Sequence, residues 1–237
     1  MAATDAMETI QSSAPAAPSR NRKAVVYPTG DGKPLGEDEI HVRATLNCIQ
    51  FLEFWFDNRP DVYVIGNNFV YWHEGTPRDR VSPDCYVVFG VENRIRPSYR
   101  SWEEDGKLPD VVFEFTSKST RRQDTDRKFT LYEQEWKARE YFLFDPSREY
   151  LTPPLQGYTL VGGHYVPLEC KDNRIYSEML GLELVMNGAY LRFFDPIRAR
   201  YIPTLAESEA EKVQMQAEKA QMQTELDELR RKHGRDA

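Results

Sequence analysis

The segment of residues 109–146, PDVVFEFTSKSTRRQDTDRKFTLYEQEWKAREYFLFDP, constrains the fold more than any other part of the chain. An apolar run at residues 111–115 is bounded by Pro-Asp before it and by Ser and Thr after it, which is typical of a strand that is covered on both faces. A helix is predicted from about Thr125 to Trp136, and a second strand at residues 140–144. A strand, a helix and a strand in this order predict two parallel strands joined by a crossover helix.

Glu114 is the unusual residue of this segment, because it places a carboxylate inside a strand whose neighbouring positions are apolar. An unpaired charge in a protein interior costs several kcal/mol or more. Glu114 must therefore accept hydrogen bonds, pair with a cation or bind a metal ion. We regard it as a candidate site residue.

The length and composition predict one globular domain with additional segments at its ends. The chain has 237 residues, of which 40% are hydrophobic and 12% are aromatic, and this is enough to fill one core of ordinary size. The formal net charge of −7 lacks the basic excess that is usual in proteins that bind nucleic acid non-specifically. Nucleic-acid binding would therefore need a local basic patch.

The cysteines and the lack of long apolar stretches bear on the compartment. Cys48, Cys85 and Cys170 are far apart and lack metal-ligand spacing, and two of them lie in apolar runs where a free thiol packs like a small hydrophobic side chain. No apolar stretch reaches the roughly 20 residues that span a bilayer, and the N-terminal residues lack the pattern of a signal peptide. These features predict a protein of the reducing cytoplasm.

Three regions are predicted along the chain. Residues 1–23 are rich in Ala, Ser, Thr and Pro without an apolar period, and we expect a disordered tail there. Residues 24–203 are expected to form the globular domain, and its first helix is predicted from about Asp38 to just before Asn58. Residues 204–237 have the composition of a charged helix.

Short strands are predicted in both halves of the domain. Residues 62–65 and 69–72 flank Gly66-Asn67-Asn68, whose tolerance of positive φ predicts a hairpin. A further strand is predicted at residues 85–89. Four later runs predict antiparallel edge strands or a meander, and they lie at residues 158–161, 164–168, 182–186 and 189–194.

The C-terminal region has a heptad pattern of small residues. Its a and d positions follow steps of four and three, and they are Ala206, Ala210, Val213, Ala217, Ala220 and Thr224. A seam made mostly of alanine buries little area per layer. A single charged helix in solvent and a weak coiled coil are therefore equally open alternatives.

Two acidic residues could meet at one edge of the predicted sheet. Asp84 follows a proline and opens an apolar strand, and Glu114 lies in the next long strand. Carboxylates within about 4 Å of each other repel unless a cation lies between them, and hard oxygen ligands suit Mg²⁺ or Mn²⁺. Lys128 occupies a face of the crossover helix distinct from its apolar stripe, so its ammonium could reach the strand ends. Metal-assisted hydrolysis follows as a hypothesis.

These residues resemble a known family. A Pro-Asp before one strand, an acidic residue in the next and a nearby lysine are similar to the PD-(D/E)XK nuclease superfamily. More narrowly, residues 109–146 resemble the signature of the Uma-two family, bacterial proteins described as "putative restriction endonucleases": Pro-Asp, an apolar strand with Glu, Ser-x-Ser-Thr, an Asp and a Lys on a helix, Tyr, and an aromatic strand that closes on Asp-Pro. Ser82-Pro83-Asp84 is similar to the upstream Pro-Asp of the family, and the likeness covers roughly His41 to Thr204.

The resemblance implies an α/β fold, with a restriction-endonuclease-like mixed β-sheet flanked by helices and a C-terminal charged helix. It also implies that Asp84 and Glu114 are ligands of Mg²⁺ or Mn²⁺, together with the backbone carbonyl of Phe115. Because the superfamily sometimes draws a further acidic ligand from the first helix, Glu53 is a candidate as well.

The position of the catalytic lysine departs from the superfamily. That lysine normally stands two positions after the acid, where this chain has Thr116. Lys128 is the substitute that we expect, supplied by the helix. It would position the attacking water or help to deprotonate it, while the metal stabilises the phosphate.

A local basic cluster surrounds the candidate lysine in the sequence, and it consists of Lys118, Arg121, Arg122 and Arg127 in addition to Lys128. The cluster could offset the global acidity and contact DNA phosphates. A solvated loop rich in Arg and Lys is the alternative.

Each candidate residue also has a purely structural explanation. Asp84 could cap a turn after its proline. Glu114 could form a buried ion pair with Lys128 or an arginine, and Lys128 could support its helix by pairing with Asp124. Asp110 repeats the Pro-Asp signal at the start of its strand, and for it we expect a role in a turn.

The predicted function is Mg²⁺-dependent hydrolysis of DNA phosphodiester bonds, with Asp84 and Glu114 holding the metal and Lys128 assisting. Paired cuts in duplex DNA ordinarily need two active sites related by symmetry, so a homodimer is expected in that case. The alternative is a nuclease-like domain that no longer cuts and serves as a binding or assembly module. Thr116 at the usual lysine position motivates this alternative.

Overall fold

Two parallel strands, β6 (Val111–Phe115) and β7 (Glu140–Phe144), form the centre of a six-stranded sheet with the order β1-β4-β6-β7-β8-β9. The computed structural model describes residues 25–28 and 39–233, and the predicted tail at residues 1–23 lies outside them. Between β6 and β7 the chain forms a helix at residues 121–136, which we call the crossover helix. The predicted parallel crossover is therefore confirmed.

The crossover helix begins four residues earlier than predicted and is not a regular α-helix. It contains two π-helical stretches, η2 (Gln123–Lys128) and η3 (Leu131–Trp136). Such wide turns often occur at functional sites. The helix ends at Lys137, whose φ of 53° is left-handed.

The other strands of the large sheet pair in antiparallel fashion, and they are β1 (Val62–Ile65), β4 (Cys85–Phe89), β8 (Leu155–Val161) and β9 (His164–Pro167). In the register between β4 and β6, Cys85 lies opposite Phe113. Because the two strands run in opposite directions, the start of β4 lies beside the end of β6. This register brings Asp84 to the same end of the sheet as Glu114.

A second antiparallel sheet follows in the sequence, and its strands are β10 (Arg174–Ser177), β11 (Leu182–Asn187), β12 (Tyr190–Asp195) and β13 (Arg200–Tyr201). The antiparallel strands predicted after Pro146 are thus present, divided between two sheets. Helix α1 (Glu39–Trp55) packs between the large sheet and β12, close to its predicted bounds.

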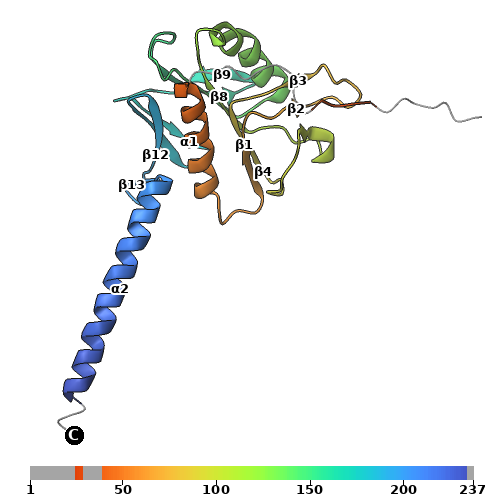
Figure 1. Ribbon diagram of the computed structural model, residues 1–237. Coiled ribbons are helices and arrows are strands. Elements are labelled where there is room, and N and C mark those ends of the chain that lie inside the picture. Colours follow the sequence, from red (N-terminus) through yellow and green to blue (C-terminus); the bar gives the residue numbers. More distant parts are fainter. Residues whose placement is uncertain (1–24, 29–38, 234–237) are drawn as a thin grey trace, which may run out of the picture.

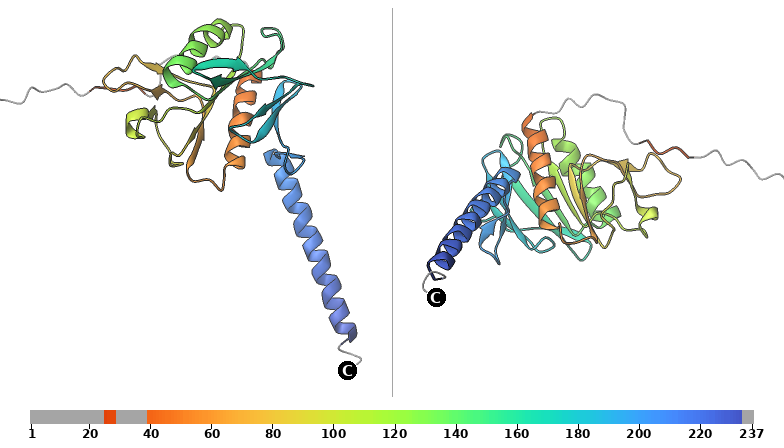
Figure 2. Two further views of the ribbon diagram at one scale, coloured as in Figure 1. Left: turned by 180° about the vertical axis from the view of Figure 1, so that it is seen from behind. Right: turned by 60° about the horizontal axis from the view of Figure 1, so that its bottom comes forward.

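The large sheet is covered on both faces. On one face the buried side chains of α1 join Phe113, Phe142 and Phe193 in one apolar cluster. On the other face Tyr132 and Trp136 of the crossover helix pack against residues such as Val112. Figure 2 shows α1 and the crossover helix on opposite sides of the strands. The prediction of a mixed β-sheet flanked by helices is confirmed.

The predicted hairpin after β1 is wrong. β2 (Val70–Tyr71) pairs with β3 (Arg80–Val81) and β5 (Tyr99–Arg100) in a separate three-stranded sheet, whereas β1 pairs with β4. The residues between β1 and β2 pack against the backbone of Pro83 and Asp84, so β2 does not fold back onto β1. The N–H of Asn67 donates to the carbonyl of Pro83 at 2.9 Å, and a Cβ at Gly66 would lie 1.8 Å from the carbonyl oxygen of Asp84. Glycine at position 66 thus allows close approach to the Asp84 backbone.

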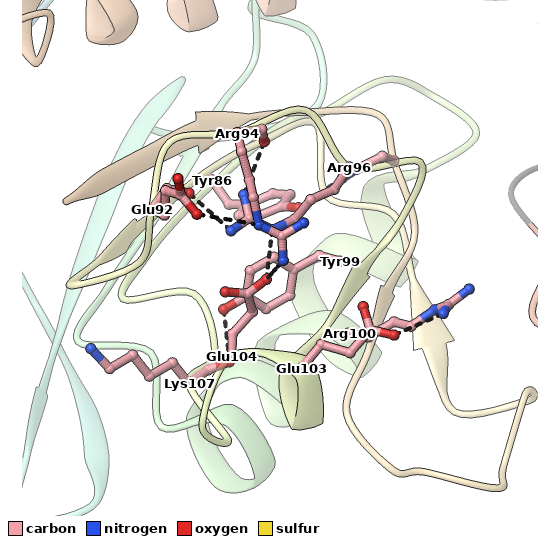
Figure 3. Close-up of polar contacts among 10 residues, drawn as sticks. Tyr86, Glu92, Arg94, Arg96, Tyr99, Arg100, Glu103, Glu104 and Lys107 are labelled. Carbon is pink, nitrogen blue, oxygen red and sulfur yellow. Dashed lines mark hydrogen bonds and ion pairs between the residues drawn. The ribbon is translucent and has the colours of Figure 1, made fainter. Parts of the chain in front are cut away.

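A polar cluster fixes the connection between β4 and β6, which includes η1 (Ser101–Glu103), at the sheet end opposite to Asp84 (Figure 3). Arg96 is buried, and its Nε lies 2.7 Å from Oε1 of Glu104. Its guanidinium also lies over the ring of Tyr63, at 4.4 Å from the centroid. The Tyr99 hydroxyl donates to the carbonyl of Lys107 at 2.9 Å. These contacts give the cluster a structural role.

The last helix, α2 (Leu205–His233), projects from the body of the molecule (Figure 1). A capping box starts it, because Thr204 Oγ1 accepts from the N–H of Glu207 at 3.2 Å and Glu207 Oε2 accepts from the N–H of Thr204 at 2.7 Å. The predicted C-terminal charged helix is confirmed, while the choice between a single helix and a coiled coil stays a prediction. None of the helices in the described residues has the length and apolar composition to cross a membrane.

Candidate functional site

Asp84 connects the start of β4 to the end of β6. Its Oδ2 accepts a hydrogen bond from the N–H of Phe115 at 2.6 Å and lies 3.5 Å from Nε2 of His41. Burial alone would raise the pKa of Asp84. The interactions with His41, Lys128 and the Phe115 N–H outweigh that effect, so the pKa lies below its usual value. Asp84 is therefore held as a carboxylate, and it does more than cap a local turn.

Glu114 is completely enclosed, and both of its oxygens have partners. Lys128 Nζ lies 2.7 Å from Oε2, and the Tyr132 hydroxyl donates to Oε1 at 2.6 Å. Burial raises the pKa of Glu114 well above its usual value, Lys128 opposes this, and the charges of Asp84 and Asp124 add to it. The ion pair between Glu114 and Lys128, which the sequence left as an alternative, is present.

Asp124 is a third buried carboxylate at this place. Its Oδ1 lies 3.1 Å from Lys128 Nζ, yet neither oxygen accepts a hydrogen bond of ordinary geometry from the described residues. Burial raises the pKa of Asp124. The sequence alone suggests Asp124 only as a helix partner of Lys128. The spacing of four residues between Asp124 and Lys128 was the available signal. Residues four apart lie on the same helix face, so if Lys128 reaches the strand ends, Asp124 lies near them as well.

Lys128 bridges Glu114 and Asp124 from the crossover helix. Burial would lower the pKa of this lysine, but the charges of Glu114, Asp124 and Asp84 raise it above its usual value. Lys128 therefore stays protonated across the physiological range. A protonated lysine donates hydrogen bonds but cannot accept a proton, and the partners of Lys128 in the structure are Glu114 and Asp124.

The charges of this group do not balance. Three buried acids, Asp84, Glu114 and Asp124, stand against the ammonium of Lys128 and the imidazole of His41, so with a neutral His41 the fully ionised group carries a surplus of negative charge, and this is why burial raises the pKa values of Glu114 and Asp124. Within the described part of the chain, no three His, Cys, Asp or Glu side chains already stand in the arrangement of a metal site. The donors nevertheless fit a hard divalent cation in chemistry and in charge, and the poorly satisfied oxygens of Asp124 are consistent with such an ion.

A cavity of about 570 Å³ adjoins Asp84, whereas Glu114, Asp124 and Lys128 are not among the residues that line it. His41 and Asp84 form one part of its wall, residues 116–120 form a second, and the turn at residues 146–150 after β7 contributes the third. Asp145 shapes that turn, because its buried carboxylate accepts from the N–H groups of Ser147, Arg148 and Leu151. The volume is in the range of cavities that hold a small ligand.

Comparison with known protein families identifies the family of the chain. The Uma-two family model, described as "Putative restriction endonuclease", matches residues 22–187, which is most of the chain. The chain belongs to the Uma-two family. No curated protein matches it.

Solved structures also align with this Uma-two chain. One of them is a protein from Anabaena variabilis described as a "putative nuclease", with a TM-score of 0.44 and 12% sequence identity. The alignment covers 61% of this chain and 75% of that one.

The predicted DNA-binding residues lie beside the cavity and on the crossover helix. Lys118 lines the cavity, whereas Arg121, Arg122 and Arg127 are exposed on the crossover helix. None of these four side chains pairs with a carboxylate of the described residues. Phe115 is the last residue of β6, and its N–H donates a hydrogen bond to the Asp84 carboxylate.

Glu53 and Asp110 lie elsewhere. Glu53 is exposed and lines two other cavities, and it lies about 18 Å along α1 from His41 by helix geometry. The structure therefore does not bring Glu53 to the carboxylates. Asp110 Oδ2 accepts from the N–H of Phe89 at 2.9 Å, at the opposite end of β4 and β6. It has a structural role.

Proposed function

We propose that this Uma-two protein hydrolyses DNA phosphodiester bonds with Mg²⁺ or Mn²⁺, held by Asp84, Glu114 and the backbone carbonyl of Phe115. The observation that carries the proposal is the surplus of buried carboxylates at the joined ends of β4 and β6, beside a cavity. Such a cluster is costly in a folded protein unless a cation compensates it. Asp124 would join the ligands or hold Lys128 in place.

The protein groups around the ion have distinct roles in this proposal. A divalent ion bound there would supply Lewis-acid stabilisation of the charge that develops on the phosphate. Lys128, which is protonated and 2.7 Å from Glu114, would fix the orientation of that carboxylate and donate to a substrate oxygen or the attacking water. Tyr132 holds the other Glu114 oxygen at 2.6 Å and so completes its orientation.

DNA is the substrate class that best suits the surroundings. Lys118, Arg121, Arg122 and Arg127 are exposed and have no carboxylate partner among the described residues. Free basic side chains beside an acidic site are suited to hold a polyanionic backbone while one phosphate is attacked.

A cleavage assay tests the proposal. Supercoiled plasmid is incubated with Mn²⁺ or Mg²⁺ and with wild type, Asp84→Asn, Glu114→Gln or the control Glu53→Gln. We expect cleavage by the wild type and by the control, and a loss of roughly a hundredfold or more in the two site variants. Equal products from wild type and Glu114→Gln would refute the proposal. Binding of DNA without cleavage by the wild type would favour the inactive binding module instead.

A further inference from the structure

The loop at residues 116–120, between β6 and the crossover helix, faces the cavity with all five of its residues. Four of them carry hydroxyl groups, namely Thr116, Ser117, Ser119 and Thr120, and Lys118 carries an ammonium. The loop contains no acidic residue. The hydroxyls of Ser117, Ser119 and Thr120 hydrogen-bond one another, so the Thr116 hydroxyl and the Lys118 ammonium are the side-chain donors most open to an anion.

The backbone of the loop also offers donors. The N–H of Arg121 donates to the carbonyl of Ser117 at 3.0 Å, and that of Asp124 to the carbonyl of Thr120 at 2.9 Å, so the helical bonding starts there. Within the described chain, the N–H groups of Lys118, Ser119 and Thr120 have no protein acceptor. Free N–H groups at the start of a 16-residue helix favour negative charge.

Thr116 provides a second and independent observation. Its side chain lines the cavity and is only 2% exposed, and its Oγ1 has no hydrogen-bond partner among the described residues. A buried hydroxyl without a partner is costly and is rare in native proteins. An oxygen atom of a ligand in the cavity would supply the missing acceptor.

We propose that residues 116–120, with Thr116 Oγ1 as the innermost donor, form a phosphate-binding site. Thr116 directly follows the last residue of β6, and its N–H continues the pairing with β7 by donating to the carbonyl of Phe144 at 2.7 Å, so it lies about 7 Å along the chain from Glu114. The site would therefore take a phosphate group beside the one that water would attack at the carboxylate cluster. This assignment to a DNA phosphate rests on the proposed function, whereas anion binding itself does not.

Two carboxylates line the same cavity and oppose an anion. Asp84 accepts from the Phe115 N–H and faces His41, so part of its charge is compensated. Glu149 is exposed, on the part of the wall formed by residues 146–150. Lys118 and the helix N-terminus lie on the wall where the phosphate would be held.

Binding of inorganic phosphate tests the site without metal or cleavage. The full chain is titrated calorimetrically in EDTA, as wild type, Thr116→Val, Thr116→Ser and Thr45→Val. Thr45 is the matched control, because its buried hydroxyl also lacks a partner in the described chain but does not line the cavity. We expect Thr116→Val to weaken phosphate binding roughly tenfold, and Thr116→Ser and Thr45→Val to bind like the wild type.

The unfolding midpoint of each variant verifies that it is folded. Thr116→Val should unfold at the same temperature as the wild type or higher, since its hydroxyl has no protein partner to lose. A wild type that binds no phosphate, or a Thr116→Val variant that binds it equally well, would overturn the proposal. So would binding that appears only with Mn²⁺ and ignores the substitution, because the phosphate would then sit on the metal.

Competition identifies the source of the phosphate. An unstructured oligothymidylate should displace inorganic phosphate from the wild type in EDTA. Failure to compete would overturn the assignment to nucleic acid. If phosphate and oligonucleotide both bind at Thr116 while the plasmid assay shows no cleavage, this site stands and only the nuclease proposal fails.

Discussion

Lys128 is the residue on which the buried acidic cluster depends. It contacts two carboxylates, those of Glu114 and Asp124, and the third, of Asp84, also raises its pKa. In a structural ion pair, both partners would contribute to stability. In a metal site, the lysine would stabilise the metal-free protein by pairing with the acids, whereas each acid would lower the stability of the metal-free protein.

Substitution of the two partners separates these cases. In EDTA, Lys128→Met should lower the free energy of unfolding by about 3–5 kcal/mol, because the buried Glu114 and Asp124 lose the ammonium that pairs with them. Glu114→Gln should change it by less than about 1 kcal/mol or raise it, because it removes surplus charge and keeps the shape. Urea unfolding at neutral pH measures both. Equal, large losses would mean that the pair is only structural.

The chemistry of single residues could be predicted to a limited depth. Asp84, Glu114 and Lys128 stood out because a charge next to an apolar run needs an explanation, and the structure brings all three together. For Asp124 the only signal was its spacing of four residues from Lys128, and nothing in the sequence tells that His41 faces a buried acid. Glu53 was suggested by the likeness to the superfamily, but its side chain lines two other cavities.

At the scale of elements, the connection after β7 determines the shape of the cavity. Asp145 is fully buried there and its carboxylate accepts several backbone hydrogen bonds. Burial alone would raise its pKa, but the N–H groups of Tyr150, Leu151 and their neighbours lower it below the usual value. A group of this kind stabilises the fold above its ordinary pKa of about 3.9, and this stabilisation is lost as the pH falls through the lowered value.

Asp145→Asn should therefore destabilise the protein in a pH-dependent way. At pH 7 we expect the free energy of unfolding to fall by about 2 kcal/mol, because the charged acceptor of several N–H groups is gone. Below about pH 3.9 the difference between variant and wild type should shrink. Urea unfolding at the two pH values checks this, with the exposed Asp57→Asn as control. A difference that does not depend on pH would contradict the assigned role.

The elements differ in how far sequence determines them. The central strands could be read from short apolar runs, because a strand buried on both faces needs an apolar side chain at nearly every position. The hairpin of β1 and β2 could not be judged locally. The chain does bend at Gly66 and Asn67, but this bend packs against the backbone near Asp84, which is distant in the sequence.

At the scale of the whole molecule, charge is unevenly distributed. The formal net charge is −7, yet Lys118, Arg121, Arg122 and Arg127 lie close together in the sequence as exposed cations without carboxylate partners in the described chain. DNA binding through them should be strongly salt-dependent.

Replacing Arg121 and Arg122 by glutamine tests this patch. The slope of log K against log salt should become smaller in magnitude by about 1.8, and binding should weaken by a similar factor for all DNA sequences. Fluorescence anisotropy at several salt concentrations measures the slope. Lys137→Gln, at the far end of the crossover helix, is the control. An unchanged slope in the double variant would show that the patch is a solvated loop.

Helix α2 contributes little to the stability of the body. Its Glu207 pairs with Arg192 at 3.0 Å, while Leu205 is 67% exposed at the start of the helix. Removal of residues 205–237 should change the free energy of unfolding of the body by less than about 1 kcal/mol. A loss of several kcal/mol would contradict this. Light scattering on both forms distinguishes the alternatives for α2, since only a coiled coil loses a dimer on truncation.

The most direct test of the metal site is calorimetric titration of the full chain with Mn²⁺, for wild type, Asp84→Asn and Glu114→Gln, each verified as folded. We predict that the wild type binds Mn²⁺ and that both variants lose this binding, because each removes an anionic ligand from the same cluster. Absence of binding to the wild type, or undiminished binding to both variants, would contradict the account.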